Sequence, residues 1–405
     1  MVEPIENIAK NFTEFLLRQD TKELDLKPKL FHFAIDVICK VVFGILTKCH
    51  RNENQEIIDL AHKVLENYRL KTYFDDFKYH FPSLFPTQYW NQSAKIFSQM
   101  TKEIIDQREN VKNVGDFIDR LKMMKMEGLD EKLVNAQGMM FITSGYEISN
   151  VLGSLIFHVS ANPDVQELII QEICMYEENY NLKKLKYLEA CIYETLRICP
   201  PVLCQYRHCV QDCIINGIQV KKGTNIQLAI HASHMDPEYF CQPSKFKPER
   251  FLRLKPLIKP FTYRPFGCGY RCSIGQQLSI TIIKVFMVQF MKSFKIKNLD
   301  GKLKFNKGYL NFHNHQTIMV GLEPRTDYDL QRKYSHCLIA ENIKKSRKLS
   351  ILGKKSSLRK MSKMSICNGQ LRKKSSKRRI SFANCLQRSR KVALVPELNV
   401  QHIQL

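Results

Sequence analysis

Apolar side chains recur at helical spacing along most of the chain. Residues 4–18 place five of them near one helical face, namely Ile5, Ile8, Phe12, Phe15 and Leu16. The same spacing predicts further helices over residues 26–46, 54–69, 93–110, 134–157, 164–179, 186–199 and 279–294. Asn162-Pro163 and the paired prolines Pro200-Pro201 are typical of helix ends.

Residues 211–234 follow a different pattern. Short runs of β-branched side chains flank Asn216-Gly217, a pair that favours a tight turn between two strands. No internal repeat interrupts these elements. The pattern as a whole predicts a mainly α fold with minor β, formed by one domain over residues 1–325.

Positive charge is concentrated at the C-terminal end of the chain. Residues 330–405 hold 20 Lys and Arg against 2 Asp and Glu, and the whole chain has a net charge of +24. A Lys/Arg/Ser-rich segment with few bulky apolar side chains cannot bury enough surface to offset the entropy of ordering. Residues 326–405 are therefore expected to form a disordered basic tail that attracts an anionic membrane surface or nucleic acid.

Composition sets several classes of protein aside. The sequence contains no run of eighteen apolar residues, the minimum for a membrane-spanning helix. Its first residues do not resemble a secretory leader. The 14 cysteines follow no regular pairing, which in such a chain favours reduced thiols. We therefore look for the function in the globular part.

The stretch RPFGCGYRCSIGQQL, residues 264–278, is the first candidate for chemistry. Gly267, Gly269 and Gly275 let the backbone turn tightly and approach a flat group closely. The N-terminus of a following helix favours a cysteine thiolate, and Arg271 can pair with an anionic group. A glycine-rich loop with two structural thiols is the alternative interpretation.

A second motif, ETLR, places Glu194 and Arg197 one helical turn apart, and KFKPERF downstream adds Arg250. Because this helix is otherwise apolar, we expect a buried network rather than a solvated surface pair. In the long apolar helix, FITSGYEISN contains small and polar residues, which indicate a distortion or a cavity wall. A glycine tolerated inside a core helix is the alternative there.

These motifs, in this order, resemble the cytochrome P-450 superfamily of haem-thiolate monooxygenases. The sequence pattern is most similar to that of the microsomal clan, whose members oxidise drugs, steroids and xenobiotics. The family's haem-binding loop, Phe-x-x-Gly-x-Arg-x-Cys-x-Gly, is matched at Phe266, Gly269, Arg271 and Gly275. Its Glu-x-x-Arg and Pro-Glu-Arg-Phe motifs are matched by the network residues, which the resemblance makes structural. The resemblance covers residues 1–325.

The resemblance implies a cytochrome P-450 fold lacking its N-terminal part, because the family's membrane anchor and first strands would precede residue 1. It implies haem b (iron protoporphyrin IX) as the cofactor, and an apolar small molecule and O2 as substrates. A separate NADPH-dependent reductase would supply electrons. The implied location is the cytosolic face of the endoplasmic reticulum membrane, or the cytosol without the anchor.

Site residues follow from the same resemblance. Glu147 and Ser149 would relay protons on the side of the haem where O2 binds. Arg207 and Arg271 would neutralise the haem propionates, and the loop around Phe266 would hold the cofactor.

The chain departs from the family at the metal ligand. The family's cysteine position is Ser273, and a cysteine stands one place earlier, at Cys272. A serine hydroxyl has too high a pKa to replace a thiolate. We therefore predict Cys272 as the iron ligand, through a one-residue slip of the loop, with Cys268 as a weaker candidate. The family's proton-delivery threonine falls on Ile148, which has no hydroxyl.

Two alternatives stay open. The chain could be a catalytically impaired or haem-less remnant whose basic tail binds an anionic membrane or nucleic acid. A zinc site is the other, although its spacings are unlike those of a zinc knuckle, and its residues would be Cys199, Cys204, His208, Cys209 and Cys213.

Overall fold

The computed structural model of the chain describes residues 2–19, 23–62, 89–108, 116–176, 181–252, 258–299, 301–304 and 316–326. The chain divides into two compact units, Met1–Gln205 with Leu228–Gln331 and Tyr206–Gln227 with Arg332–Leu405. The basic tail expected over residues 326–405 lies, after its first residue, outside the described residues.

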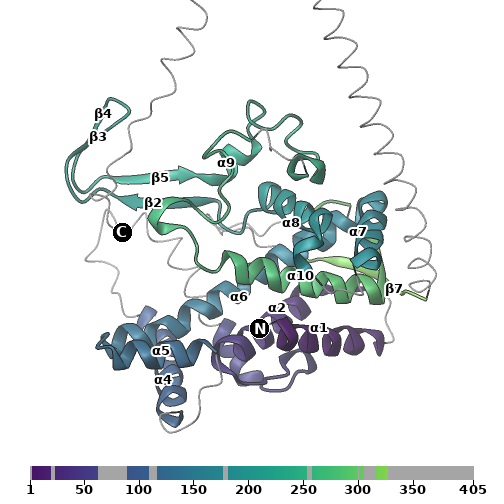
Figure 1. Ribbon diagram of the computed structural model, residues 1–405, viewed down its shortest axis with the longest axis horizontal. Helices are drawn as coiled ribbons and strands as arrows, with labels where there is room; N and C mark the ends of the chain where they lie inside the picture. Colours follow the sequence, from purple (N-terminus) through teal and green to yellow (C-terminus); the bar gives the residue numbers. More distant parts are fainter. Residues whose placement is uncertain are drawn as a thin grey trace, which may run out of the picture. The chain divides into compact units, whose positions relative to one another are not determined.

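The first unit is mainly helical, as predicted (Figure 1). Its α-helices are α1 (Val2–Leu17), α2 (Leu26–Ile38), α4 (Tyr89–Gln107), α5 (Phe117–Met126), α6 (Glu131–Ser160), α7 (Pro163–Tyr176), α8 (Lys186–Ile198), α9 (Ile230–Met235) and α10 (Gln276–Ser293). Residues 55–62 are also helical, and the rest of the helix predicted over 54–69 lies outside the described residues. The periodic pattern missed α5. The prediction was also wrong at α9, because the sequence pattern favoured strands as far as residue 234.

Helix α2 shows how the sequence sets its own ends. Asp25 precedes the helix and its carboxylate accepts a hydrogen bond from the Lys27 N–H at 3.0 Å, which caps the first turn. The helix continues as a π-turn over Cys39–Phe43 and stops at Gly44, whose φ of 72° lies in the left-handed region. The prediction that Gly44 ends this helix is confirmed.

The core lies where α1 packs on α10 and α2 packs on α6. Four of the five apolar residues predicted for the inner face of α1 are buried, and Phe12 lies 5.7 Å from the Phe286 ring of α10 between centroids. A Cβ on Gly145 would come within 3.3 Å of Ile38 Cγ1, so this glycine lets α2 approach α6 closely.

A three-stranded antiparallel sheet joins segments from far apart in the chain. Its strands are β1 (Glu23–Asp25), β7 (Met319–Pro324) and β6 (Phe294–Asn298), in that spatial order. Glu23 pairs with Gly321, and Phe294 pairs with Pro324. The hydrophobic pattern did not predict these short strands.

The described part of the second unit is residues 206–227. It contains the antiparallel hairpin of β3 (Cys213–Ile215) and β4 (Ile218–Val220), with the adjoining parts of β2 (Cys204–His208) and β5 (Asn225–Ala229), which pair with each other. The turn residues Asn216 and Gly217 have φ values of 48° and 81°, the pattern of a type I′ hairpin turn. The turn predicted at this pair is confirmed.

Within the described ranges, no helix combines the length and the apolar character needed to cross a bilayer.

Candidate functional site

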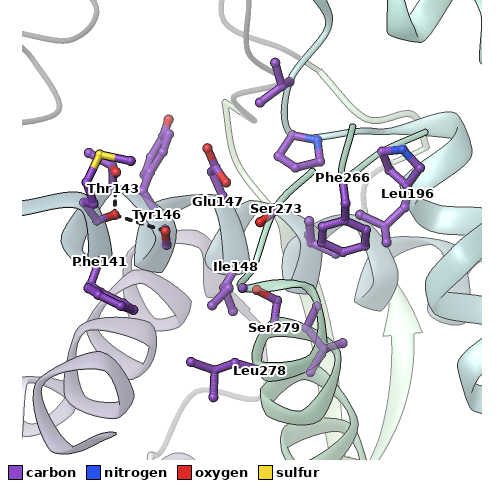
Figure 2. A pocket seen from close by; sticks show the side chains of 18 of the residues that line it. Phe141, Thr143, Tyr146, Glu147, Ile148, Leu196, Phe266, Ser273, Leu278 and Ser279 are labelled. Atoms are coloured by element: carbon purple, nitrogen blue, oxygen red, sulfur yellow. Dashed lines mark hydrogen bonds between the residues drawn. The ribbon is translucent and has the colours of Figure 1, made fainter. Parts of the chain in front are cut away.

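A cavity of about 410 Å³ lies in the first unit, between α6 and the segment that leads into α10 (Figure 2). Its lining is predominantly apolar. The apolar lining residues are Ile38, Met140, Phe141, Ile148, Val151, Leu196, Pro201, Val202, Pro265, Phe266, Leu278 and Ile283. A concave, mostly apolar site with a few polar groups is typical of small-molecule binding.

Helix α6 lines one side of this cavity with polar as well as apolar side chains. Glu147 projects into it, and burial raises the pKa of this carboxyl to about 7. Ile148, at the family's threonine position, also lines the cavity. Ser149 is not a lining residue, and its hydroxyl donates a 2.7 Å hydrogen bond to the Tyr146 carbonyl of its own helix. The proton-relay roles of Glu147 and Ser149 stay predictions.

The loop on the other side is pinned by three backbone hydrogen bonds. Gly267 N donates to Arg264 O at 3.0 Å, Cys272 N to Gly269 O at 3.1 Å and Ser273 N to Phe266 O at 2.8 Å. Gly267 and Gly269 have φ values of 75° and 70°, which side chains other than glycine rarely adopt. Residues 269–271 form a single 3₁₀ turn, and Gly275 precedes α10.

This backbone decides which side chains face the cavity. Ser273 and Arg271 line it, and Figure 2 shows the Ser273 side chain pointing into the same space as Glu147. Cys272 is exposed and is not among the lining residues, and Cys268 is half-buried outside the lining. The loop therefore presents a hydroxyl oxygen to the cavity where the family has a thiolate.

Beside the loop lies the network expected from the ETLR motif. Arg197 is fully buried, and its guanidinium donates to both carboxylate oxygens of Glu194 at 2.9 Å. Arg250 Nε donates to Glu194 Oε1 at 3.1 Å. The remaining Arg197 donors reach the carbonyls of His234 at 2.8 Å and Pro243 at 2.6 Å. The structure brings the three predicted network residues together around the Glu194 carboxylate.

The sequence did not point to His234, which belongs to this arrangement as well. Its carbonyl accepts from Arg197, and its ring Nε2 accepts a 3.0 Å hydrogen bond from Arg264 N, at the start of the cavity loop. Burial lowers the pKa of this imidazole to about 3, so it is neutral at physiological pH and can accept. His234 thus connects the network to the loop. No motif marks it, because the contact depends on how the chain folds back.

Arg207, the other predicted propionate partner, belongs to the second unit. It is half-buried there and donates a 2.8 Å hydrogen bond to the Tyr206 carbonyl. Its role toward a propionate stays a prediction. The zinc alternative gains no support, since the described residues contain no group of three or more His, Cys, Asp or Glu side chains arranged to hold a metal ion.

Comparisons with known proteins identify the family of this chain. The family model described as Cytochrome P450 matches residues 1–318, and the chain belongs to this family. It is 29% identical to human Cytochrome P450 3A5 over 300 residues and 30% identical to rabbit (Oryctolagus cuniculus) Cytochrome P450 3A6 over 312 residues. These alignments cover 68% and 69% of this chain. Rat thromboxane-A synthase is 33% identical over 173 residues, which are 40% of this chain and 32% of that protein.

The chain spans about three fifths of the length of these P450 relatives, 59% of the human protein and 61% of the rabbit one. The family is one of haem-dependent monooxygenases. Membership makes haem the expected cofactor, and the cavity residues can be tested against it.

Part of the cavity fits this cofactor. Phe266 and Gly275 line it on the loop side, where a flat apolar group can lie, and Arg271 lines it as a partner for the anionic edge of that group. The donor set does not fit, because the loop directs the Ser273 hydroxyl into the cavity and Cys272 away from it. A thiolate-held haem requires a loop conformation different from this one.

Proposed function

We propose that the chain uses its cytochrome P450 scaffold to bind an apolar organic molecule in the cavity between α6 and the loop. The finer function is insertion of one oxygen atom from O2 into that molecule. The apolar lining, with Glu147 as an ionisable group inside it, is the observation that supports this proposal. Haem b held by a thiolate supplies oxygen activation when it is bound.

The metal ligand in this proposal is Cys272. To enter the cavity in place of Ser273, it must give up the backbone hydrogen bonds that hold both residues. Two such bonds contribute about 1 kcal/mol each, and the loop glycines make the change sterically accessible. Bonding between iron and sulfur therefore has to offset about 2 kcal/mol. Arg271, which lines the cavity, would meet a propionate.

Partners follow from the family. An NADPH-dependent reductase would be the electron donor, and the endoplasmic reticulum membrane, on its cytosolic face, would be the location. The basic residues between 330 and 405 would strengthen attachment to an anionic membrane surface.

A second candidate function has an observation in its favour. Because Ser273 faces the cavity, the chain could be a haem-less or catalytically impaired member of the family that still binds apolar molecules. In that case, its basic tail would be the part of the chain that binds a membrane or nucleic acid.

One spectrum separates the two candidates. The full chain is incubated with haem, reduced and treated with carbon monoxide, beside the variants Cys272→Ser and Cys268→Ser. A red-shifted Soret band of the thiolate type in the parent and in Cys268→Ser, lost in Cys272→Ser, supports the first candidate. An unchanged thiolate band in Cys272→Ser would remove Cys272 as the ligand. Absence of haem absorbance in the parent supports the second candidate.

A further inference from the structure

The described part of the second unit holds a pair of cysteines that the proposed function does not use. Cys209 follows β2, and Cys213 begins β3. Their Sγ atoms lie 3.6 Å apart. The Cys209 thiol also donates to the Gln211 carbonyl at 2.9 Å, within the short connection between the two strands.

We propose that Cys209 and Cys213 form a reversible disulfide when the chain meets a disulfide oxidant of the glutathione type. The proposal does not depend on haem or on the function proposed above.

The backbone holds the two residues in place for this bond. Cys209 N donates to Thr224 O at 2.9 Å, and Gly223 N donates to Cys209 O at 2.7 Å. Cys213 is in register with Val220 across the hairpin. A disulfide bond is about 2.05 Å long, so the sulfur atoms must approach by about 1.5 Å. Rotation of the two side chains can supply this movement without breaking the strand pairing.

The polar cost of the change is small. Oxidation removes the Cys209 S–H donor from Gln211 O, but Gln211 is exposed, so water can replace that donor. None of the cysteines in the described part of the chain is in a disulfide. In proteins that keep their thiols reduced, the disulfides that do form are usually transient and redox-sensitive rather than structural.

Exposure sets the order of the two steps. Cys213 is half-buried and meets the oxidant, whereas Cys209 is 1% exposed. The Cys213 thiolate attacks one sulfur of the oxidant, which releases one reduced thiol and leaves a mixed disulfide. The Cys209 thiolate then attacks the Cys213 sulfur and releases the second reduced thiol. Together the two cysteines lose two protons and two electrons, and the oxidant takes up both.

The test uses the full chain, oxidised glutathione and tryptic peptide mass spectrometry. Cleavage after Arg207 and Lys221 leaves both cysteines in one peptide. We expect this peptide to become lighter by two hydrogen atoms and to resist alkylation. After reduction, its original mass should return and both cysteines should again be alkylated. Cys241→Ser, which removes an exposed thiol elsewhere, should behave like the parent.

Cys209→Ser provides the sharper arm. Without the second thiol, Cys213 should retain glutathione as a stable mixed disulfide. If that variant does not fold by circular dichroism, Cys209→Ala replaces it, and the parent's own peptide mass still decides the matter. A parent peptide that carries glutathione on one or both cysteines, or that stays fully alkylated, would overturn the proposal.

Discussion

The buried ion network and the cavity loop lie side by side in the fold, but the polar residues of the network are buried and those of the loop are exposed. Arg197 has no exposed surface, and it donates to carboxylate and carbonyl oxygens all around it. Arg271, Cys272 and Ser273 of the loop are all exposed, so the fold places little demand on which side chain stands at each position. A network of buried charges does not tolerate the loss of a member, because an uncompensated charge stays behind.

This difference explains how the chain can keep the scaffold of its family and yet present the wrong atom to its cavity. Exchanging a cysteine and a serine between adjacent exposed positions leaves packing nearly unchanged. It does change the donor that faces Glu147 and the apolar walls. The network therefore mainly determines stability, and the loop determines which donor atom faces the cavity. Each prediction below tests one of these two assignments.

The largest effect is expected at the network. Arg197→Ala leaves the Glu194 carboxylate buried with fewer donors and orphans the carbonyls of His234 and Pro243. We expect the free energy of unfolding in urea to fall by about 3 to 5 kcal/mol. The matched control is Arg18→Ala, since Arg18 forms an exposed pair with Glu14 at 3.9 Å, and little change is expected there. Equal losses in the two variants would contradict the assignment of a buried network.

The next effect concerns the loop. The double variant Cys272→Ser with Ser273→Cys places a thiol at the position that lines the cavity without altering composition. The slip of the loop, which costs about 2 kcal/mol, is then unnecessary. We expect haem affinity, measured by titration, to rise by about tenfold or more, with a thiolate-type band after reduction and addition of carbon monoxide.

The single variant Cys272→Ser is the control for this exchange, and it should gain nothing because it has no thiol to present. Equal or lower haem occupancy in the exchanged variant would mean that a feature other than the loop limits cofactor binding.

An effect of similar size is expected from Glu147, the cavity carboxyl with a pKa of about 7. An unfolded glutamate has a pKa of about 4.3, so the folded chain holds this proton more tightly. The resulting stability is fully present below pH 4.3 and is lost as the pH rises to about 7. Across this window the parent should lose roughly 1 to 3 kcal/mol relative to Glu147→Gln, which cannot titrate. Parallel pH profiles of urea unfolding in the two proteins would contradict the burial of this carboxyl.

The same contrast separates what the sequence could predict from what it could not. Long periodic segments such as α1 and α6 and local signals such as Gly44 and Asn216-Gly217 depend on neighbours in the chain, and these predictions were confirmed. The β1-β7-β6 sheet and the His234 contact bring together residues distant in sequence, and no local pattern marks them.

The orientation of the loop illustrates this limit. Cys272 and Ser273 are adjacent, so residue type and spacing cannot decide which of them faces the cavity. That choice depends on the hydrogen bond from Ser273 N to Phe266 O and on the anchoring of Arg264 N by His234. Both are tertiary features of the fold.

The smallest effect is expected from the basic residues 330–405, which lie outside the described residues. The charge of residues 330–405, 20 basic against 2 acidic, predicts binding to anionic lipid that weakens steeply as salt rises. A chain truncated after Arg325 should bind vesicles containing phosphatidylserine more weakly than the full chain at low salt, and the difference should disappear at high salt. Neutral vesicles serve as the control. Truncation should also leave the unfolding transition in urea unchanged if this segment contributes nothing to the core. Equal binding by the two chains, or binding insensitive to salt, would remove the segment from any account of membrane attachment.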